Sequence, residues 1–559
     1  MKRRQFIKKT AWSAVFASNL LIKGCVESKE YDILITGGLV YDGLGAPGRE
    51  ADIALKNNRI VKIAGEIRKS KALEVVDARG MAVAPGFIDP HTHSDVQLLA
   101  NPRAESKIRQ GVTTEIGGNC GFTYFPLSDR SYEENRKLLE RRYSVELTWK
   151  EMKGFFNRLE ESGMALNFAT LLGHGNLRDA VMGPYDRPPS DKELKSMKQI
   201  VREHLKAGVL GLSTGLEYTP GSFAKTDELV ELCRDVAELN GVYATHIRSE
   251  QDLVLEAIDE AIAISRETGV SLQISHIKAN YKKNWSKISD ILQKIEAAKD
   301  NGVPILADRY PYNASSTGLN SFFPLWAREG TNADFVARLK DKSLEGKLKA
   351  HIKEMGEKME TWDNVLLSSV LTDINKHLEG KTVLKAAIES KKTPYEFMRD
   401  LLIDEDGQVG MVKFGMSEDN LRQVLAHPLV VIGSDGNAVA PYGSLSKDKP
   451  HPRFYGTFPR VLGRYVRDEN ILSLQEAVRR MTSLTADKFG LAERGRITEG
   501  CYADIVIFNP DTVIDRATYE DPHRYPEGII YVIVNGQIVI NNGEHTGKLP
   551  GRILRKQVV

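Results

Sequence analysis

Gly86-Phe87-Ile88-Asp89-Pro90-His91-Thr92-His93 is the stretch of sequence that decides the fold. An apolar, β-prone run, residues 81–88, leads into two histidines separated by one residue. Alternate residues of an extended segment project to the same side, so both imidazoles face one way, as in a metal clamp. His-x-His alone is a weak signal, because surface histidines are common. The prediction of a metal site depends on whether further ligands follow other apolar runs.

Eight short apolar runs alternate with helix-like segments through the centre of the chain. This pattern is typical of parallel strands joined by crossover helices, and eight strands make a (β/α)8 barrel. We therefore predict an α/β fold with a TIM barrel in residues 85–489. The predicted strands are residues 82–89, 112–117, 166–172, 209–213, 242–245, 271–275, 304–307 and 429–432. The predicted helices include residues 191–207, 226–239 and 253–267.

Both ends of the chain are rich in short β-prone runs separated by turn residues. They lie at residues 31–36, 52–55, 59–63 and 74–77, and again at 503–508, 529–534 and 537–540. Asn535-Gly536 between the last two runs is a strong hairpin signal. We predict one small β-sandwich domain, with an antiparallel sheet, built from residues 31–84 and 490–559.

The connection between the seventh and eighth predicted strands is far too long for a βα loop. It contains charged helix formers, for example in residues 335–358 and 393–402. We interpret residues 313–425 as a helical insertion after barrel strand 7. Loops of this length are usually lids or substrate clamps. The alternative is an insertion with no role in function.

Candidate metal ligands follow the predicted strands, and the active site of a TIM barrel lies at these strand ends. In chain order the residues are His91, His93, Cys120, His174, His246, His276 and Asp435. Zinc binds imidazole, thiolate and carboxylate, and a catalytic site keeps one position open. Cys120, His246 and His276 form a plausible three-ligand zinc site. His91 and His93 fit a second metal that shares the Cys120 sulfur.

Asp435 follows an apolar strand and opens onto a glycine. A carboxylate beside a cation stays ionised and can take a proton from water, so we predict Asp435 as the catalytic base. His174 fits a structural and a substrate-facing role equally. Glu115 lies within the second strand and is expected to point away from the site.

Charge and cysteine usage exclude several classes of protein. Lys and Arg number 77, Asp and Glu 75, and the net charge is +2, which argues against nucleic acid as a partner. The four cysteines are too widely scattered for a disulfide framework. Only Cys120 lies at a strand end among glycines.

Residues 1–30 have the order of an export signal, with a basic segment, an apolar segment and Gly24-Cys25. Arg3-Arg4-Gln5-Phe6-Ile7-Lys8 resembles a twin-arginine signal. Cys25 also lies in a sequence resembling a lipobox, from which Lys23 departs. We expect an exported protein, either periplasmic or attached to a membrane only through lipidated Cys25. The alternative is a basic tail on a cytoplasmic enzyme.

Motifs along residues 31–555 together resemble the N-acyl-D-amino-acid deacylases, or D-aminoacylases, of the amidohydrolase superfamily. They are FIDPHTH (87–93), QGVTT (110–114), GNCG (118–121), GLSTG (211–215), VYATHIR (242–248), ISHIK (274–278), YPY (310–312), GSDG (433–436), HPR (451–453), GTFPR (456–460) and AERG (492–495). The resemblance implies zinc-dependent hydrolysis of an N-acyl-D-amino acid to a carboxylate and a D-amino acid. Preference for D substrates is implied by the resemblance alone.

The resemblance also assigns roles to residues. A cysteine takes the place of the carboxylated lysine that bridges two metals elsewhere in the superfamily. Cys120, His246 and His276 would hold one zinc tightly, and His91 and His93 would line a weaker second site, so that one metal can suffice. The residues implied near the substrate carboxylate are Lys278, Tyr310 and Ser316, with Arg248 as a further partner.

Two alternatives remain at this point. Another amidohydrolase, such as a hydantoinase-like cyclic amidase or a D-dipeptidase, would use similar ligands; Cys120 and the long insertion favour the deacylase. A non-catalytic amidohydrolase-like binding or scaffold protein would lack ligands, and here none is missing. The acyl group and the preferred side chain depend on pocket shape.

Overall fold

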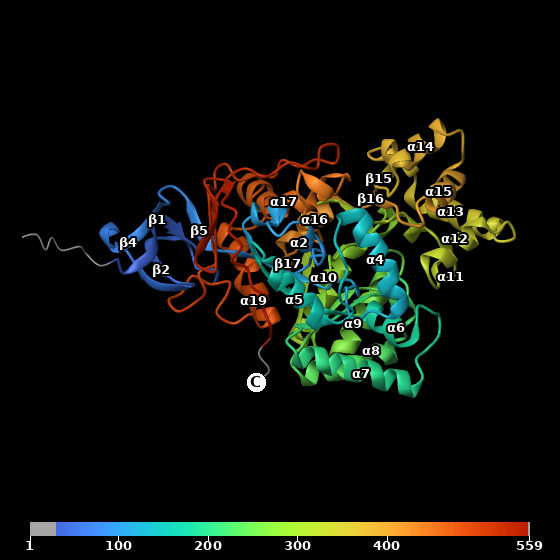
Figure 1. Ribbon diagram of the computed structural model, residues 1–559, viewed down its shortest axis with the longest axis horizontal. Helices are drawn as coiled ribbons and strands as arrows, with labels where there is room; N and C mark the ends of the chain where they lie inside the picture. The colour runs from blue at the N-terminus through green and yellow to red at the C-terminus, as the bar shows by residue number, and fades with distance from the viewer. Residues whose placement is uncertain (1–28, 557–559) are drawn as a thin grey trace, which may run out of the picture.

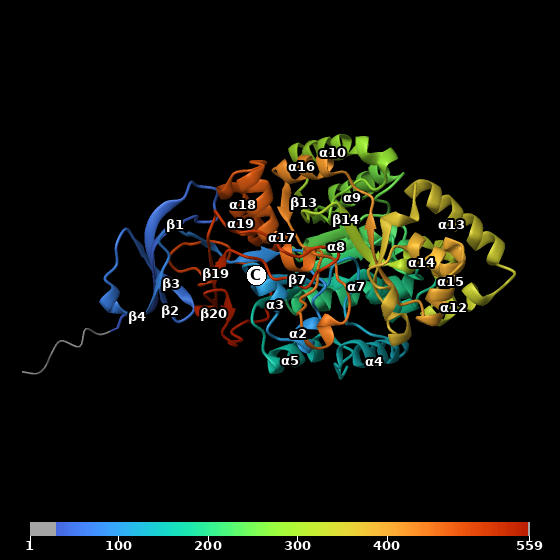
Figure 2. The same cartoon turned by 90° about the horizontal axis from the view of Figure 1, so that it is seen from above.

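The computed structural model describes residues 29–556. The expected export signal, including the twin-arginine motif and Cys25, lies outside these residues. The N-terminal strands β1 (Tyr31–Val40) and β2 (Arg49–Lys56) occupy one end of the molecule's long axis, and the insertion with α12 (Asn332–Lys340) occupies the other (Figures 1 and 2). The barrel lies between them. Within the described part of the chain, no helix is both long and apolar enough to cross a membrane.

The barrel strands form two parallel sheets, which meet at the third strand position of the barrel. The first has the order β6-β7-β8, and the second has the order β17-β13-β12-β11-β10-β9. Their bounds are Phe87–Asp89 (β6), Val112–Gly117 (β7), Asn167–Thr170 (β8), Leu172–Gly173 (β9), Gly211–Gly215 (β10), Val242–His246 (β11), Ser271–Ile274 (β12), Ile305–Arg309 (β13) and Val430–Ile432 (β17). Only Leu171 separates β8 from β9, so together they form the third of eight barrel positions. The prediction of a TIM barrel is confirmed.

The prediction of one strand over residues 82–89 is wrong. The run divides at Gly86 into β5 (Ala82–Pro85), which pairs with the C-terminal β18 (Ile505–Phe508), and β6, which pairs with β7. The Gly86 N–H donates to the carbonyl oxygen of Asp504 at 2.8 Å. A Cβ atom at Gly86 would collide with the side chain of Thr113, so this crossing point needs glycine.

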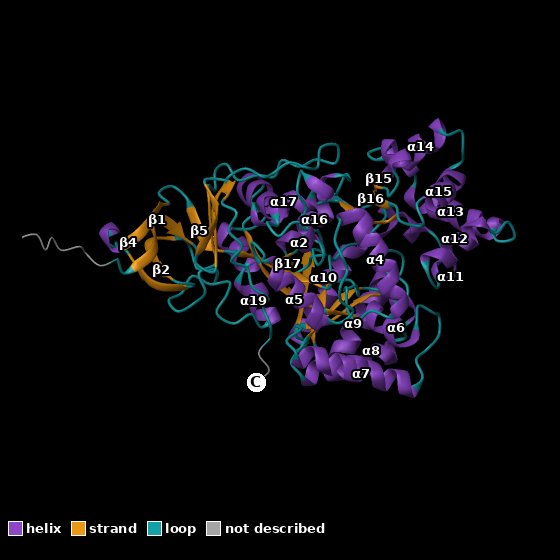
Figure 3. Ribbon diagram, in the orientation of Figure 1, coloured by secondary structure: helices purple, strands orange, loops and turns teal. Residues whose placement is uncertain are grey.

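Strands from both ends of the chain share one nine-stranded sheet, whose order is β21-β20-β19-β18-β5-β1-β2-β3 with β4 beside β1. Its strands β1, β2, β4 and β5 lie together at one end of the molecule (Figure 3). The further bounds are Arg59–Ala64 (β3), Ala72–Asp77 (β4), Ile529–Val534 (β19), Gln537–Asn541 (β20) and Glu544–His545 (β21). The hairpin at Asn535-Gly536 is present between β19 and β20. The expectation of a purely antiparallel sheet is wrong, because β4 and β5 both run parallel to β1.

Amphipathic helices cover the barrel where the sequence predicts them. They include α7 (Asp191–Lys206), α8 (Thr226–Glu238) and α9 (Val254–Thr268). The N-terminus of α7 carries a capping box between Ser190 and Glu193, which satisfies backbone donors that a helix start leaves free.

The prediction of a helical insertion is only partly correct. Besides α12, it contains α11 (Leu325–Arg328), α13 (Glu345–Met359), α14 (Val383–Glu389) and α15 (Pro394–Asp404). It also contains an antiparallel sheet of order β14-β16-β15, formed by Ala314–Gly318, Gly410–Phe414 and Val365–Ser369. The insertion has a hydrophobic core of its own, which includes Phe335, Leu348 and Met411. Thr317 Oγ1 donates to the Tyr218 hydroxyl at 3.3 Å, so the sheet lies against the loop that follows β10.

Candidate active site

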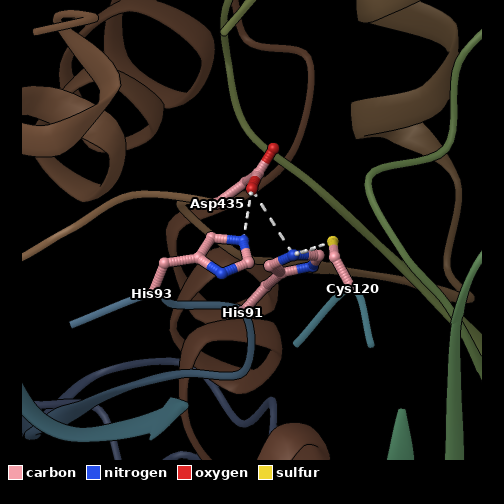
Figure 4. Close-up of side chains that lie close together, drawn as sticks. All are labelled: His91, His93, Cys120 and Asp435. Atoms are coloured by element: carbon pink, nitrogen blue, oxygen red, sulfur yellow. Dashed lines mark hydrogen bonds and ion pairs between the residues drawn. The ribbon is translucent and has the colours of Figure 1, made fainter. Parts of the chain in front are cut away.

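Four of the predicted residues meet where the first and last barrel strands close the barrel (Figure 4). His91 and His93 follow β6, Cys120 follows β7, and Asp435 follows β17. His91 Nε2 lies 3.3 Å from Cys120 Sγ and 3.4 Å from Asp435 Oδ1. His93 Nε2 lies 3.2 Å from the same Asp435 oxygen. The opening histidine pair is therefore in direct contact with the predicted base.

Cys120 also faces the two histidines from the opposite side of the barrel. Its Sγ lies 3.9 Å from His246 Nδ1 and 3.6 Å from His276 Nε2. Tetrahedral zinc with Zn–S and Zn–N bonds of about 2.3 and 2.1 Å separates sulfur from nitrogen by about 3.6 Å. The donor types and their spacing therefore fit zinc at Cys120, His246 and His276. The group formed by His91, His93, Cys120 and Asp435 shares the thiolate and fits a second ion.

Asp308 contacts the His91 ring and the His276 backbone, and it is not among the predicted residues. Its Oδ1 lies 3.1 Å from His91 Nδ1 and accepts from the His276 backbone N–H at 2.8 Å, while Gln273 donates to its other oxygen at 2.9 Å. A carboxylate on the remote nitrogen fixes the tautomer and direction of a ligating imidazole. The predicted seventh strand ends at Ala307, whereas β13 continues through Asp308. A polar residue at the end of this strand is the sequence signal that could have identified Asp308.

Two further carboxylates lie behind His246 and His276, and sequence reasoning misses them as well. Glu250 Oε1 lies 2.9 Å from His276 Nδ1 and accepts a hydrogen bond from Lys278. Glu217 Oε2 lies 3.5 Å from His246 Nε2, and its other oxygen accepts from the Glu250 backbone N–H at 3.1 Å. Both glutamates lie on loops after barrel strands, where no regular pattern singles them out.

The electrostatics of the site favour the reactive forms of Cys120 and Asp435. Burial opposes ionisation of the Cys120 thiol, but His91, His246 and His276 hold its pKa well below its usual 9.0. Thiolate is the form that binds metals. Burial likewise opposes ionisation of Asp435, but Arg453 and the histidines hold its pKa well below 3.8. Asp435 is therefore an ionised acceptor at neutral pH.

Three site residues adopt backbone conformations that favour glycine. The φ angles are 52° at Cys120, 35° at His276 and 50° at Asp435. Such conformations cost a non-glycine residue about 1–3 kcal/mol each and persist only where surrounding contacts impose them. Each of these residues comes directly after or near a different barrel strand, so the strained turns aim three side chains into one site.

Arg453 is a buried cation at the site and is not among the predicted site residues, although it lies in the HPR motif. Its Nη1 lies 2.9 Å from Asp435 Oδ2, and its guanidinium lies 4.5 Å from the centre of the Tyr310 ring. Lys278 Nζ lies 5.9 Å from that ring centre and 2.8 Å from His276 Nδ1. Among the described residues, the buried Tyr310 hydroxyl has no hydrogen-bond partner. These donors converge beside the candidate metal-donor residues.

Ser316 lies in β14, and its carbonyl oxygen accepts from Arg453 Nη2 at 3.5 Å. It lines a cavity of about 310 Å³ together with Asn437 and Phe454. The cavity borders the loop that carries Asp435, which brings Ser316 to the edge of the site.

The placement of Arg248 contradicts the expectation that it contacts substrate. Its guanidinium donates twice to Glu260, at 2.9 Å each, and to the carbonyl oxygens of Ser222 and Ala224 at 3.0 Å. These bonds occupy its donors within the protein. The sequence places Arg248 after a strand but cannot show the direction in which its side chain turns.

His174 and Glu115 lie outside the metal-donor groups. His174 Nε2 lies 2.9 Å from Glu228, which also binds Arg178, so the structural interpretation of His174 holds. Glu115 is buried, accepts from Ser94 at 2.9 Å and lies 3.3 Å from Lys107 Nζ. It supports the barrel behind the site.

Comparisons with known proteins agree with this geometry. The model of a family described as the amidohydrolase family matches residues 74–363 and 377–540. D-aminoacylase of Alcaligenes xylosoxydans xylosoxydans is 35% identical over 530 residues, covering 95% of this chain and 99% of that protein. N-acyl-D-glutamate deacylase of the same organism is 35% identical over 531 residues, covering 94% and 97%.

A solved structure agrees as well. N-acyl-D-glutamate deacylase from Bordetella bronchiseptica, in complex with zinc and a phosphonate inhibitor that mimics the tetrahedral intermediate, matches with a TM-score of 0.80 and 35% identity, covering 94% of this chain and 99% of that one. The chain therefore belongs to the amidohydrolase family, in its N-acyl-D-amino-acid deacylase, or D-aminoacylase, branch.

Proposed function

We propose that this protein is a zinc-dependent hydrolase that cleaves the amide bond of N-acyl-D-amino acids, giving a carboxylate and a D-amino acid. One observation carries the proposal: an ionised carboxylate, Asp435, lies in contact with His91 and His93 of a metal-donor group that shares Cys120 with the zinc set. The similarity to two deacylases over nearly their whole length supports the same reaction.

Cys120, His246 and His276 would hold the tightly bound zinc, with His91 and His93 at a second, weaker position. Zinc bound there supplies Lewis acidity, which polarises the amide carbonyl and makes water a better nucleophile at neutral pH. Asp308 and Glu250 hold two of the imidazoles in the orientation that binding requires.

The residues of the chain carry the proton transfer and the binding of the substrate. Asp435 accepts a proton as water adds to the amide carbonyl carbon, and it delivers that proton to the amine nitrogen as the C–N bond breaks. Arg453 contacts Asp435, and Arg453 and Lys278 both lie near the Tyr310 ring, so we assign these three buried donors to the α-carboxylate of the substrate. Ser316 lies at the edge of the same site.

A hydrolysis screen tests the proposal. Paired N-acetyl-D- and N-acetyl-L-amino acids, a hydantoin and a D-dipeptide are compared on one preparation, with zinc per chain measured on the same sample. Hydrolysis of the D series in proportion to zinc content supports the proposal. Preference for the L series, for the hydantoin or for the dipeptide would indicate another amidohydrolase activity in place of the proposed one. The absence of any hydrolysis would indicate a non-catalytic role.

We also propose that the protein is exported through its twin-arginine-like N-terminus and that Cys25 can anchor it to a membrane. Arg3, Arg4 and the apolar segment before Gly24 support export. The twin-arginine route carries folded proteins, which suits an enzyme that acquires its metal during folding.

A further inference from the structure

Lys413 is a buried cation of the insertion without an acidic partner. It lies in β16 with only 8% of its surface exposed. Within residues 29–556, no carboxylate oxygen lies within 4.0 Å of its Nζ. No carboxylate of these residues is bonded to this ammonium group, so its hydrogen-bond donors are available to an anionic ligand.

The surroundings of Lys413 combine aromatic walls with a second free donor. Its Nζ lies 5.2 Å from the centre of the Tyr281 ring and 5.9 Å from that of Phe322. The Tyr281 hydroxyl is buried and lacks a hydrogen-bond partner in the described part of the chain. An ammonium and a phenol hydroxyl in one apolar setting match a carboxylate, which accepts hydrogen bonds through both oxygens.

This donor pair borders the zinc ligands. Tyr281 follows Asn280, whose side chain donates to Glu250 at 3.2 Å, and Glu250 faces His276. Burial lowers the pKa of Lys413, but Tyr281, Glu217 and Glu250 together raise it above its ordinary 10.5. The lysine is therefore protonated, within electrostatic reach of the glutamates behind the metal ligands but bonded to neither.

In the insertion sheet, Lys413 lies on the same face as Thr317, which contacts a residue beside the candidate zinc site. Lys413 pairs with Ser315 across the sheet, and Thr317 lies on the same face as Ser315. Thr317 binds the Tyr218 hydroxyl, and the Tyr218 ring lies 4.8 Å from the His246 ring, centre to centre. The strand face that carries Lys413 therefore covers the barrel beside His246.

We propose that Lys413 and the Tyr281 hydroxyl bind a second carboxylate of the substrate, on the side chain of an acidic D-amino acid or at the end of a dicarboxylic acyl group. This inference rests on the proposed function. The α-carboxylate has separate donors beside Asp435, led by Arg453. The relatives do not decide the matter, because D-aminoacylase and N-acyl-D-glutamate deacylase are both 35% identical to this chain.

Matched substrate pairs test the subsite and show which half of the substrate carries the charge. N-acetyl-D-glutamate is compared with N-acetyl-D-glutamine, and N-succinyl-D-alanine with N-butanoyl-D-alanine, by kcat/KM. We expect the wild type to prefer the acid in one pair by about 10-fold or more, as for a hydrogen-bonded charge. Lys413→Met should abolish that preference, and Tyr281→Phe should reduce it.

Lys349→Met is the matched control, because it removes an exposed lysine from α13 of the same insertion. The inference is overturned if the wild type prefers neither acid, or if Lys413→Met and Lys349→Met change the acid-to-neutral ratio equally. If Lys413→Met fails to fold, the acid-to-neutral ratios of kcat/KM for the wild type and for Tyr281→Phe test the inference. Hydrolysis of all four compounds without acid preference sinks the subsite alone, whereas no hydrolysis of any of them sinks the proposed function as well.

Discussion

The backbone N–H of Asp435 donates to the carbonyl oxygen of His91 at 2.8 Å. This hydrogen bond joins the loop after the eighth barrel strand to the loop after the first. The proposed base and His91, a proposed metal ligand, are therefore fixed to each other by the closure of the barrel itself. A second bond, from the His93 N–H to the Gly436 carbonyl oxygen at 3.2 Å, reinforces the contact.

Asp435→Asn should lower kcat about 1,000-fold, because the amide cannot accept the proton from water. Zinc per chain, measured by atomic emission, should stay near the wild-type value, since Cys120, His246 and His276 are untouched. Asp419→Asn, an exposed aspartate of α16 (Glu418–Ala426), is the control and should leave kcat unchanged. Activity in Asp435→Asn near that of the control would remove Asp435 from the mechanism.

His246→Ala should lose more zinc on dialysis than His91→Ala. His246 belongs to the three-donor set with Cys120 and His276, whereas His91 belongs to the set assigned to the weaker ion. His377→Ala, which removes an exposed histidine of the insertion, should retain all its zinc. The opposite order for the two site variants would assign the tight position to the opening histidine pair.

Arg453→Met should move the acid limb of the pH profile of kcat/KM to higher pH. Asp435 acts only when ionised, so activity is lost as pH falls through its pKa. Arg453 is the largest of the influences that hold that pKa well below 3.8 against burial. Removing an adjacent cation should raise the pKa by about 1–3 units. Arg453→Lys keeps the charge and should keep the limb near its original place; equal shifts in both variants would contradict this role.

Glu250→Gln should weaken zinc binding about 10- to 100-fold, as loss of a partner to a ligating histidine commonly does. Glu250 accepts from Lys278 and faces His276 Nδ1 at 2.9 Å. Competition with a chelator of known affinity measures the change. Glu256→Gln, on the exposed face of α9, is the matched control. Unchanged zinc affinity in Glu250→Gln would show that His276 needs no such partner.

Replacement of both Arg3 and Arg4 by lysine should leave the protein in the cytoplasm of a bacterium that has the twin-arginine pathway. The paired arginines are the part of the signal that this pathway reads. Fractionation followed by immunoblotting measures the distribution, and Lys8→Arg serves as a control that keeps the charge. Normal export of the double variant would exclude this route.

Much of the barrel can be predicted because a buried parallel strand is a short apolar run, and because ligands follow such runs. His246 and His276 are found in this way. Asp308 escapes prediction because it lies inside the polar end of β13, where the apolar pattern has already stopped. Arg453 lies far from any strand end and reaches the site only through its buried side chain.

The sheet of the insertion could not be predicted for a different reason. Strand β14 reads Ala-Ser-Ser-Thr-Gly, which has neither an apolar alternation nor β-branched residues apart from Thr317. Backbone pairing with β16 forms it, and the sequence of β14 carries no trace of that partner. Lys413 could not be assigned to the site without this pairing.

The single glycine between β5 and β6 has a consequence for engineering. Gly86 is shared by the nine-stranded sheet and the catalytic barrel, so the two units have no linker at which they can be separated. A shortened chain that begins at the barrel would lack β5 and would expose the edge of β18. The nine-stranded sheet cannot be expressed alone as one continuous segment, because its strands come from both ends of the chain. We therefore expect that neither the nine-stranded sheet nor the barrel folds when it is expressed without the other.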